Sequence, residues 1–174
     1  MTSWHAARVV LLAMLGLVLA LSGCSLVSEP APRAGTKVFG VGDCVKIPST
    51  APQMLHASEV SCAEDPSYTV GALSDDAGRC PSNEYQQLPS DFADDATSRL
   101  CLVPNLVADH CYVMEMPIGV MVRADCTDRD QQGVLVQITR RLDVRDQQAC
   151  PSDVGHFAWP YPSPPRTYCT ITVF

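Results

Sequence analysis

Apolar and polar residues alternate in several short segments of the chain. In Val120–Cys126 (VMVRADC) the valines, the alanine and the cysteine share one face, and Arg123 and Asp125 take the other. Cys169–Val173 (CTITV) and Val60-Ser-Cys62 follow the same rule. A period of two is typical of half-buried β-strands. We therefore expect these strands to direct their cysteines into the core.

Eight segments read as strands, and glycine or proline separates most of them. The predicted strands are Cys44–Ile47, Glu59–Cys62, Tyr68–Leu73, Arg99–Val103, Cys111–Glu115, Val120–Asp125, Val134–Val144 and Tyr168–Phe174. A helix is predicted over Ser82–Leu88, because Pro81 suits the first turn of a helix, and Asp91–Ser98 should hold another helical turn. The sequence thus predicts a mainly β fold with short helical turns, a small α+β fold, with such a turn after each Cys-Pro-Ser triplet.

The longest apolar run lies near the amino end, at Val9–Leu21. Its 13 residues are fewer than the about 20 that a membrane-spanning helix needs, and they match the apolar core of an export signal. The run ends in Leu21-Ser22-Gly23-Cys24, which looks like a bacterial lipobox. This pattern predicts a signal peptide over residues 1–23 and a lipid on Cys24; an ordinary cleaved signal with a chance cysteine is the alternative.

The segment behind the lipobox and the overall charge narrow the range of partners. Residues 24–36 are rich in Ser, Pro and Ala and show no period, which indicates a flexible tether after the lipidated cysteine. The chain has 12 Lys and Arg against 19 Asp and Glu, a net charge of −7. An acidic chain without a basic cluster argues against nucleic acid as a partner. The expected location is the outer face of the cytoplasmic membrane, with the protein held there by lipid at Cys24.

Eight further cysteines follow, an even number that predicts four disulfides in an exported protein. Zinc, the competing use of cysteine, favours close C-x₂-C pairs, and the sequence has none. Neighbouring cysteines on predicted hairpins favour adjacent pairing, and a crossed pattern within each group of four is the alternative. The adjacent pairs are Cys44–Cys62, Cys80–Cys101, Cys111–Cys126 and Cys150–Cys169.

The cysteines fall into two groups of four with matching local sequence. A Cys-Pro-Ser triplet carries the third cysteine of each group, at Cys80 and at Cys150. The first and fourth cysteines are 57 residues apart in one group and 58 in the other. We interpret the groups as two copies of one β unit, over residues 37–107 and 108–174, with a pseudo-two-fold relation; chance agreement is the alternative.

Several of these motifs together resemble a known family. Besides the lipobox and the tether, they are Val41-Gly42-Asp43-Cys44-Val45, Val60-Ser-Cys62, Cys80-Pro81 and Leu100-Cys101-Leu102. In combination they look like the actinobacterial lipoproteins of the LppU type, over most of the mature chain. The Gly-Asp-Cys-Val and Val-x-Cys pieces are also similar to outer-face domains described as septum-formation-like. The resemblance implies a location and a fold, and it supplies no catalytic residue.

One stretch offers soft metal donors. His110, Met114 and Met116 lie close together in the sequence, and imidazole and thioether groups suit Cu(I). The alternative is that the methionines are core residues on strands.

A second stretch offers exposed aromatic surface. Phe157, Trp159 and Tyr161 lie among prolines between the last two cysteines, in a segment expected to form a loop. A rigid apolar loop can dock a partner with little loss of entropy. The alternative is a lid packed over the protein's own core.

The sequence contains no nucleophile, metalloprotease or phosphate-loop motif. The expected function is therefore non-catalytic: a lipid-anchored cell-envelope module that presents a disulfide-stapled domain to a protein or envelope ligand. The alternatives are a carrier of a small ligand or of copper on the outer face of the membrane, and an enzyme of unknown type. No cofactor is expected.

Overall fold

The computed structural model describes residues 37–48, 54–115, 118–130 and 132–174, all within a unit that spans Thr36–Phe174. The predicted signal peptide (1–23), the lipidated Cys24, the tether (24–36) and Met116 lie outside the described residues. No helix among the described residues has both the length and the apolar character needed to cross a membrane.

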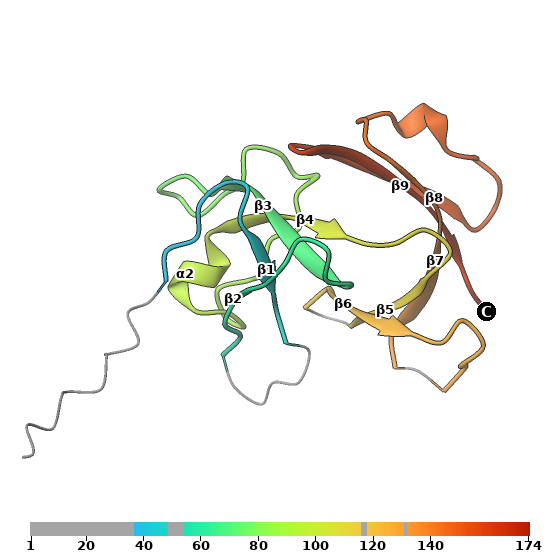
Figure 1. Cartoon of the computed structure of the whole chain (residues 1–174), viewed down its shortest axis with the longest axis horizontal. Helices are drawn as coiled ribbons and strands as arrows, with labels where there is room; N and C mark the ends of the chain where they lie inside the picture. Colours follow the sequence, from blue (N-terminus) through green and yellow to red (C-terminus); the bar gives the residue numbers. More distant parts are fainter. Residues whose placement is uncertain (1–36, 49–53, 116–117, 131) are drawn as a thin grey trace, which may run out of the picture. The chain divides into compact units, whose positions relative to one another are not determined.

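The first half of the described chain forms a four-stranded antiparallel sheet (Figure 1). Its strands are β1 (Cys44–Lys46), β2 (Ser58–Glu59), β3 (Ser67–Leu73) and β4 (Leu100–Asn105), in the order β2-β1-β3-β4. Every residue of β4 is buried. The short helix α2 (Asp95–Ser98) precedes β4, and the side chain of Asp94 caps it by accepting the N–H of Thr97.

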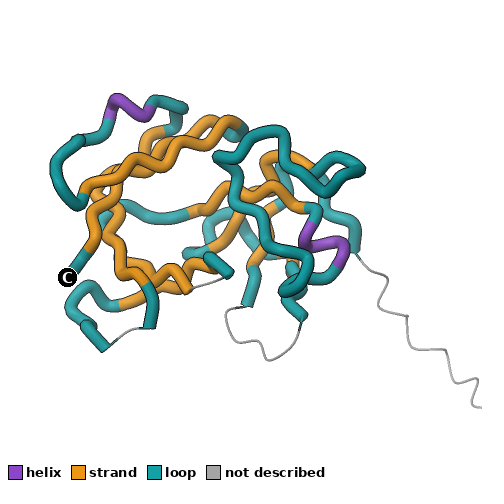
Figure 2. Tube along the Cα trace, turned by 180° about the vertical axis from the view of Figure 1, so that it is seen from behind, coloured by secondary structure: helices purple, strands orange, loops and turns teal. Residues whose placement is uncertain are grey.

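The second half forms a five-stranded antiparallel sheet in the order β6-β5-β7-β9-β8. Its strands are β5 (Cys111–Glu115), β6 (Val120–Ala124), β7 (Val134–Leu142), β8 (His156–Pro162) and β9 (Pro165–Thr172). A single 3₁₀ turn, η2 (Gln147–Ala149), lies between β7 and β8. The mainly β fold with short helical turns is confirmed, as the orange strands and brief purple segments of Figure 2 show.

Two of the predicted helical segments are not helical in the structure. Ser82–Leu88 contains no helix: Asn83 and Glu84 form a turn, and the backbone of Gln86 then exchanges hydrogen bonds of 2.9 and 2.8 Å with Leu102 of β4. The helical turn expected after the second Cys-Pro-Ser triplet is also missing, and η2 lies before Cys150 instead. The turn predicted within Asp91–Ser98 is confirmed by α2.

The eight cysteines form four disulfides in the adjacent pattern: Cys44–Cys62, Cys80–Cys101, Cys111–Cys126 and Cys150–Cys169. The expectation that strand cysteines point into the core fails for Cys62, which is exposed. It fails because β2 ends at Glu59, so the alternation does not continue to that cysteine.

The two sheets repeat one another in register. In each, the strand carrying the first cysteine pairs with its two successors, β1 with β2 and β3 and β5 with β6 and β7. A bulge interrupts β3 just before Ala72, which pairs with Cys101, and a bulge interrupts β7 just before Arg140, which pairs with Cys169. The fourth cysteine therefore occupies the same position relative to a bulge in both copies.

The entry to each sheet also repeats. Gly42 and Asp109 each lie two residues before the first cysteine of a group, and both adopt positive φ, 97° and 66°. Their N–H groups donate to Val70 in β3 (2.8 Å) and Ile138 in β7 (2.7 Å). Aspartate is among the few side chains that tolerate this backbone region. Matching bulges and matching left-handed residues support the prediction of two copies of one unit.

The two halves share their hydrophobic cores. Val120 of β6 packs into the core cluster of the first half, which includes residues of β1, β3 and β4. In the other direction, Val103 and Leu106 pack with Tyr112 and Tyr168 of the second sheet. Cavities and sites at the junction of the halves are therefore formed by side chains from both.

Candidate functional site

A mostly apolar pocket of about 350 Å³ lies at the junction of the two halves. The first half contributes Tyr85 and Pro104, the β5–β6 hairpin contributes Met114 and Met121, and β8 contributes Trp159 and Tyr161. We call this cavity the junction pocket. Its volume lies at the small end of the range for small-molecule sites, about 300–1,000 Å³.

The two methionines reach the junction pocket from neighbouring strands. Met114 of β5 and Met121 of β6 lie directly opposite each other, so their side chains leave the sheet side by side. The N–H of Met121 donates to the hydroxyl of Tyr68 (2.9 Å), which holds β6 against the first sheet. Flexible thioethers suit a wall that adapts to a ligand.

The aromatic wall comes from β8, an edge strand, whereas the sequence predicted a loop for Phe157, Trp159 and Tyr161. The three residues are two positions apart, so their side chains lie on the same face of the strand. Tyr161 is only 8% exposed and packs in the core, Trp159 is half-buried beside it, and Phe157 is 52% exposed. Tyr161 therefore packs over the protein's own core, as the lid alternative expected, whereas Phe157 remains accessible to solvent.

The prolines explain how a proline-rich segment can be a strand. The N–H of Thr172 in β9 donates to the carbonyl of Gly155 (3.0 Å), just before β8. Hydrogen-bonded positions alternate in an antiparallel ladder, so every second residue from Gly155 turns its backbone toward β9. Pro160 and Pro162 occupy the positions in between, where an N–H would face the open edge. The prolines therefore cost β8 no ladder bond, and they discourage pairing with another strand.

The opposite wall is fixed to both sheets. Beyond its backbone bonds to β4, Gln86 donates its side-chain amide to the carbonyl of Gly119 in the β5–β6 hairpin. Glu84 at the rim accepts two hydrogen bonds of 2.8 Å from Arg145, which hold the pKa of its carboxyl below the usual range. Burial raises the pKa of the Tyr85 phenol, so this side chain stays neutral at ordinary pH.

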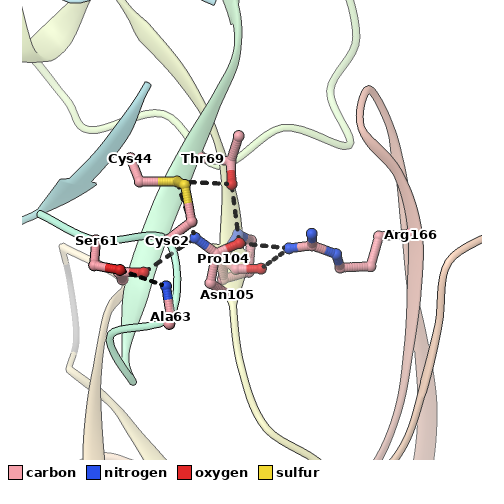
Figure 3. The surroundings of a disulfide bond; sticks show 9 residues. Cys44, Ser61, Cys62, Ala63, Thr69, Pro104, Asn105 and Arg166 are labelled. Atoms are coloured by element: carbon pink, nitrogen blue, oxygen red, sulfur yellow. Dashed lines mark hydrogen bonds between the residues drawn. A yellow bond between two sulfur atoms is a disulfide. The ribbon is translucent and has the colours of Figure 1, made fainter. Parts of the chain in front are cut away.

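Arg166 joins the two sheets (Figure 3). It is 7% exposed, and from β9 it projects toward β4, where its Nη1 donates to the carbonyl of Pro104 (2.9 Å) and to the Oδ1 of Asn105 (2.6 Å). Asn105 in turn accepts from Thr69 (2.9 Å) and contacts the Sγ of Cys44 (3.7 Å). Pro104 and the cross-strand neighbour of Arg166, Tyr161, both line the junction pocket, so this network holds two of its lining residues.

A second polar cluster surrounds Asp65, whose side chain is 14% exposed. Its Oδ2 lies 2.7 Å from the Nδ1 of His110 and 2.6 Å from the Nη1 of Arg123, and the hydroxyl of Tyr112 donates to its Oδ1. Burial raises the pKa of the Tyr112 phenol, and the hydrogen bond to the carboxylate raises it further. This cluster joins the β2–β3 connection to β5 and β6.

Of the predicted soft-metal residues, the two that the structure describes, His110 and Met114, do not converge. His110 faces Asp65, whereas Met114 faces the junction pocket, and four residues of extended strand separate them by about 13 Å. Met116 lies outside the described residues. Among the residues that the structure describes, no group of three or more His, Cys, Asp or Glu side chains could hold a metal ion.

The structure brings together two stretches that the sequence offered separately, with Met114 in one and Trp159 and Tyr161 in the other. Sequence reasoning missed Tyr85 and Pro104, which reach the pocket through contacts between the halves and carry no local signal. Comparison of the chain with protein-family models, curated proteins and solved structures found no match.

Proposed function

We propose that this protein is a non-catalytic, lipid-anchored module on the outer face of the cytoplasmic membrane. In this proposal it binds an apolar group of an envelope ligand in the junction pocket. The lipobox pattern ending at Cys24 and the four disulfides support an exported, anchored protein. The observation that carries the binding role is the meeting of Met114, Met121 and Trp159 in one cavity.

The chemistry of the pocket favours a neutral, apolar group. Its carboxylate and amide side chains are already engaged: Glu84 binds Arg145, and Gln86 binds the carbonyl of Gly119. What remains accessible is aromatic and thioether surface, from which water is readily displaced. A group that fills about 350 Å³ would be one ring system or a short alkyl segment.

The test is a titration of the mature protein with the neutral fluorescent probe 1-N-phenylnaphthylamine. We expect binding at one site, weakened at least about tenfold in Trp159→Ala. The matched control is Phe157→Ala, which removes an exposed aromatic side chain from the same face of β8 but lies outside the junction pocket. Equal affinity of the wild type and Trp159→Ala for the probe would refute the proposal that the junction pocket is the binding site. Mass spectrometry of Cys24 tests the anchor separately, and an unmodified thiol would refute it.

A second candidate, a carrier of soft monovalent metal, is favoured by the cross-strand pair Met114 and Met121 beside Trp159. Two thioethers and an indole face are a donor set that suits Cu(I) and Ag(I). Ag(I) is the better probe, since no reductant is needed and the disulfides stay intact. Met114→Leu with Met121→Leu keeps the apolar volume and removes both sulfurs. Unchanged Ag(I) binding in that variant would exclude this candidate, and loss of Ag(I) binding with retained probe binding would support it.

A further inference from the structure

A second hollow, of about 750 Å³, lies next to the junction pocket along β8. Trp159 and Ala158 border both cavities. The other walls come from the segment that carries η2, which Figures 1 and 2 show beside the β8–β9 hairpin. We call this cavity the η2 hollow. Its lining includes Gln147, Gln148, Ser152, His156, Phe157 and Trp159.

The η2 hollow differs from the junction pocket in its chemistry. The side chains of Gln147, Gln148 and Ser152 make no hydrogen bond to any described residue, and the Nδ1 of His156 also lacks a partner there. Two amides and a hydroxyl offer donors and acceptors together. None of the described residues that line the hollow is Asp, Glu, Lys or Arg. The hollow thus presents free hydrogen-bonding groups beside a lining without carboxylate, ammonium or guanidinium groups.

The segment that presents the glutamines is held in place. Asp146 caps η2 by accepting the N–H of Gln148 (2.9 Å), and its own N–H donates to the hydroxyl of Thr167 in β9 (2.9 Å). The disulfide Cys150–Cys169 fixes the other end of η2 to the same strand. A ligand would therefore meet glutamines whose backbone is already ordered, which lowers the entropic cost of binding.

Aromatic surface completes the hollow. Phe157 is 52% exposed, the highest exposure of any aromatic ring in the sheets, and Trp159 is half-buried next to it. A pyranose or furanose ring has one face of C–H groups that packs on an aromatic ring, and a rim of hydroxyls that donate and accept hydrogen bonds. Amides, a hydroxyl and aromatic rings in one hollow match both features of a sugar.

We propose that the η2 hollow binds a neutral saccharide, with Phe157 packing against the sugar ring and Gln147 and Gln148 bonding to its hydroxyls. This site adjoins the junction pocket and shares Trp159 and Ala158 with it, but it does not depend on the function proposed for that pocket. A charged saccharide fits less well, because no charged side chain of the described lining would pair with it.

The test is calorimetric titration of the mature protein with neutral oligosaccharides of glucose, galactose, arabinose and N-acetylglucosamine. We expect at least one to bind, and both Phe157→Ala and Gln148→Ala to weaken its binding about tenfold or more. Both residues are exposed, and an unchanged urea midpoint will show that each variant folds. Met114→Leu, which alters only the junction pocket, should bind the saccharide as the wild type does.

Two outcomes would overturn the proposal. One is that none of these saccharides binds the wild type at millimolar concentration. The other is that a saccharide binds but Phe157→Ala and Gln148→Ala bind it equally well, which would place it elsewhere. Neither outcome bears on the junction pocket, whose own probe and Trp159→Ala variant are read independently.

Discussion

Gly71→Ala tests the contact between the two halves most directly. Gly71 lies in the bulge of β3, and a Cβ atom built on it would be 2.0 Å from the carbonyl oxygen of Ser163, in the turn between β8 and β9, and 2.6 Å from Cε1 of Tyr85. Real Cβ contacts essentially never fall below 3.0 Å, so the carbonyl must withdraw by 1.0 Å, the difference between 3.0 and 2.0 Å, or more. The backbone of the β8–β9 turn cannot do this by rotating a side chain.

The cost should be near the upper end of the range for overpacking, about 3 kcal/mol of the free energy of unfolding. We expect a clear drop in the urea midpoint at unchanged slope, measured with the disulfides intact. The matched control is Gly40→Ala, whose added Cβ would meet nothing closer than 3.9 Å. Its unfolding free energy should change by less than about 0.5 kcal/mol.

The same variant has a functional consequence. Tyr85 lines the junction pocket, and its displacement by the new methyl group should weaken the neutral probe even where the variant is fully folded. Equal stability of Gly71→Ala and Gly40→Ala would refute the close approach of the β8–β9 turn to β3. Loss of stability with unchanged probe binding would support the contact and would show that Tyr85 does not contribute to binding of the probe.

Three further predictions concern Asp65, the buried phenol of Tyr68 and the Cys150–Cys169 disulfide. Asp65→Asn should lower the unfolding free energy by about 2 kcal/mol, because it weakens charge-assisted bonds to His110 and Arg123. The control Asp143→Asn, at a carboxyl that is 79% exposed, should lower it by less than about 0.5 kcal/mol, and equal losses of the two variants in urea unfolding would contradict this. Burial raises the pKa of Tyr68 to about 12, so the unfolded state loses this proton first, near pH 10, and the urea midpoint should fall as pH rises from about 10 to 12; a constant midpoint there would be inconsistent with a buried phenol. Replacing Cys150 and Cys169 by alanine should cost about 3 kcal/mol and abolish saccharide binding, since η2 loses its attachment to β9; full binding by the variant would show that the attachment is unnecessary.

Local pattern was enough for most of the fold. Alternation predicted β5 with its observed bounds, and it predicted β6 and β7 to within two residues, since these strands bury one face and need no special turn. The pairing of the cysteines followed from hairpins of neighbouring strands. Segments whose structure depends on a distant partner were predicted less well: within Ser82–Leu88, which is not helical, the backbone of Gln86 bonds twice to Leu102 of β4.

The candidate sites could be predicted only in part, for the same reason. Trp159 and Met114 stand out in the sequence by residue type, yet nothing in the sequence places them in one cavity. The loop predicted around Trp159 was wrong: the prolines keep this segment out of the sheet interior, but in this register they allow an edge strand. Asp65 and Arg166 carry no local signal, because their roles come from partners more than 40 residues away.

The repeat itself suggests why the candidate sites gather at β8. Gln86 is the partner of Leu102 in β4, and Phe157 is the partner of Thr170 at the equivalent position of β9. The segment around Gln86 and strand β8 are thus counterparts: a single bridge in one copy and a seven-residue strand in the other. Both line the junction pocket, from opposite sides, and only the β8 side also borders the η2 hollow. Under the predicted duplication, the strands that both halves share would maintain the fold, and β8 would supply the binding surface of the two proposed sites.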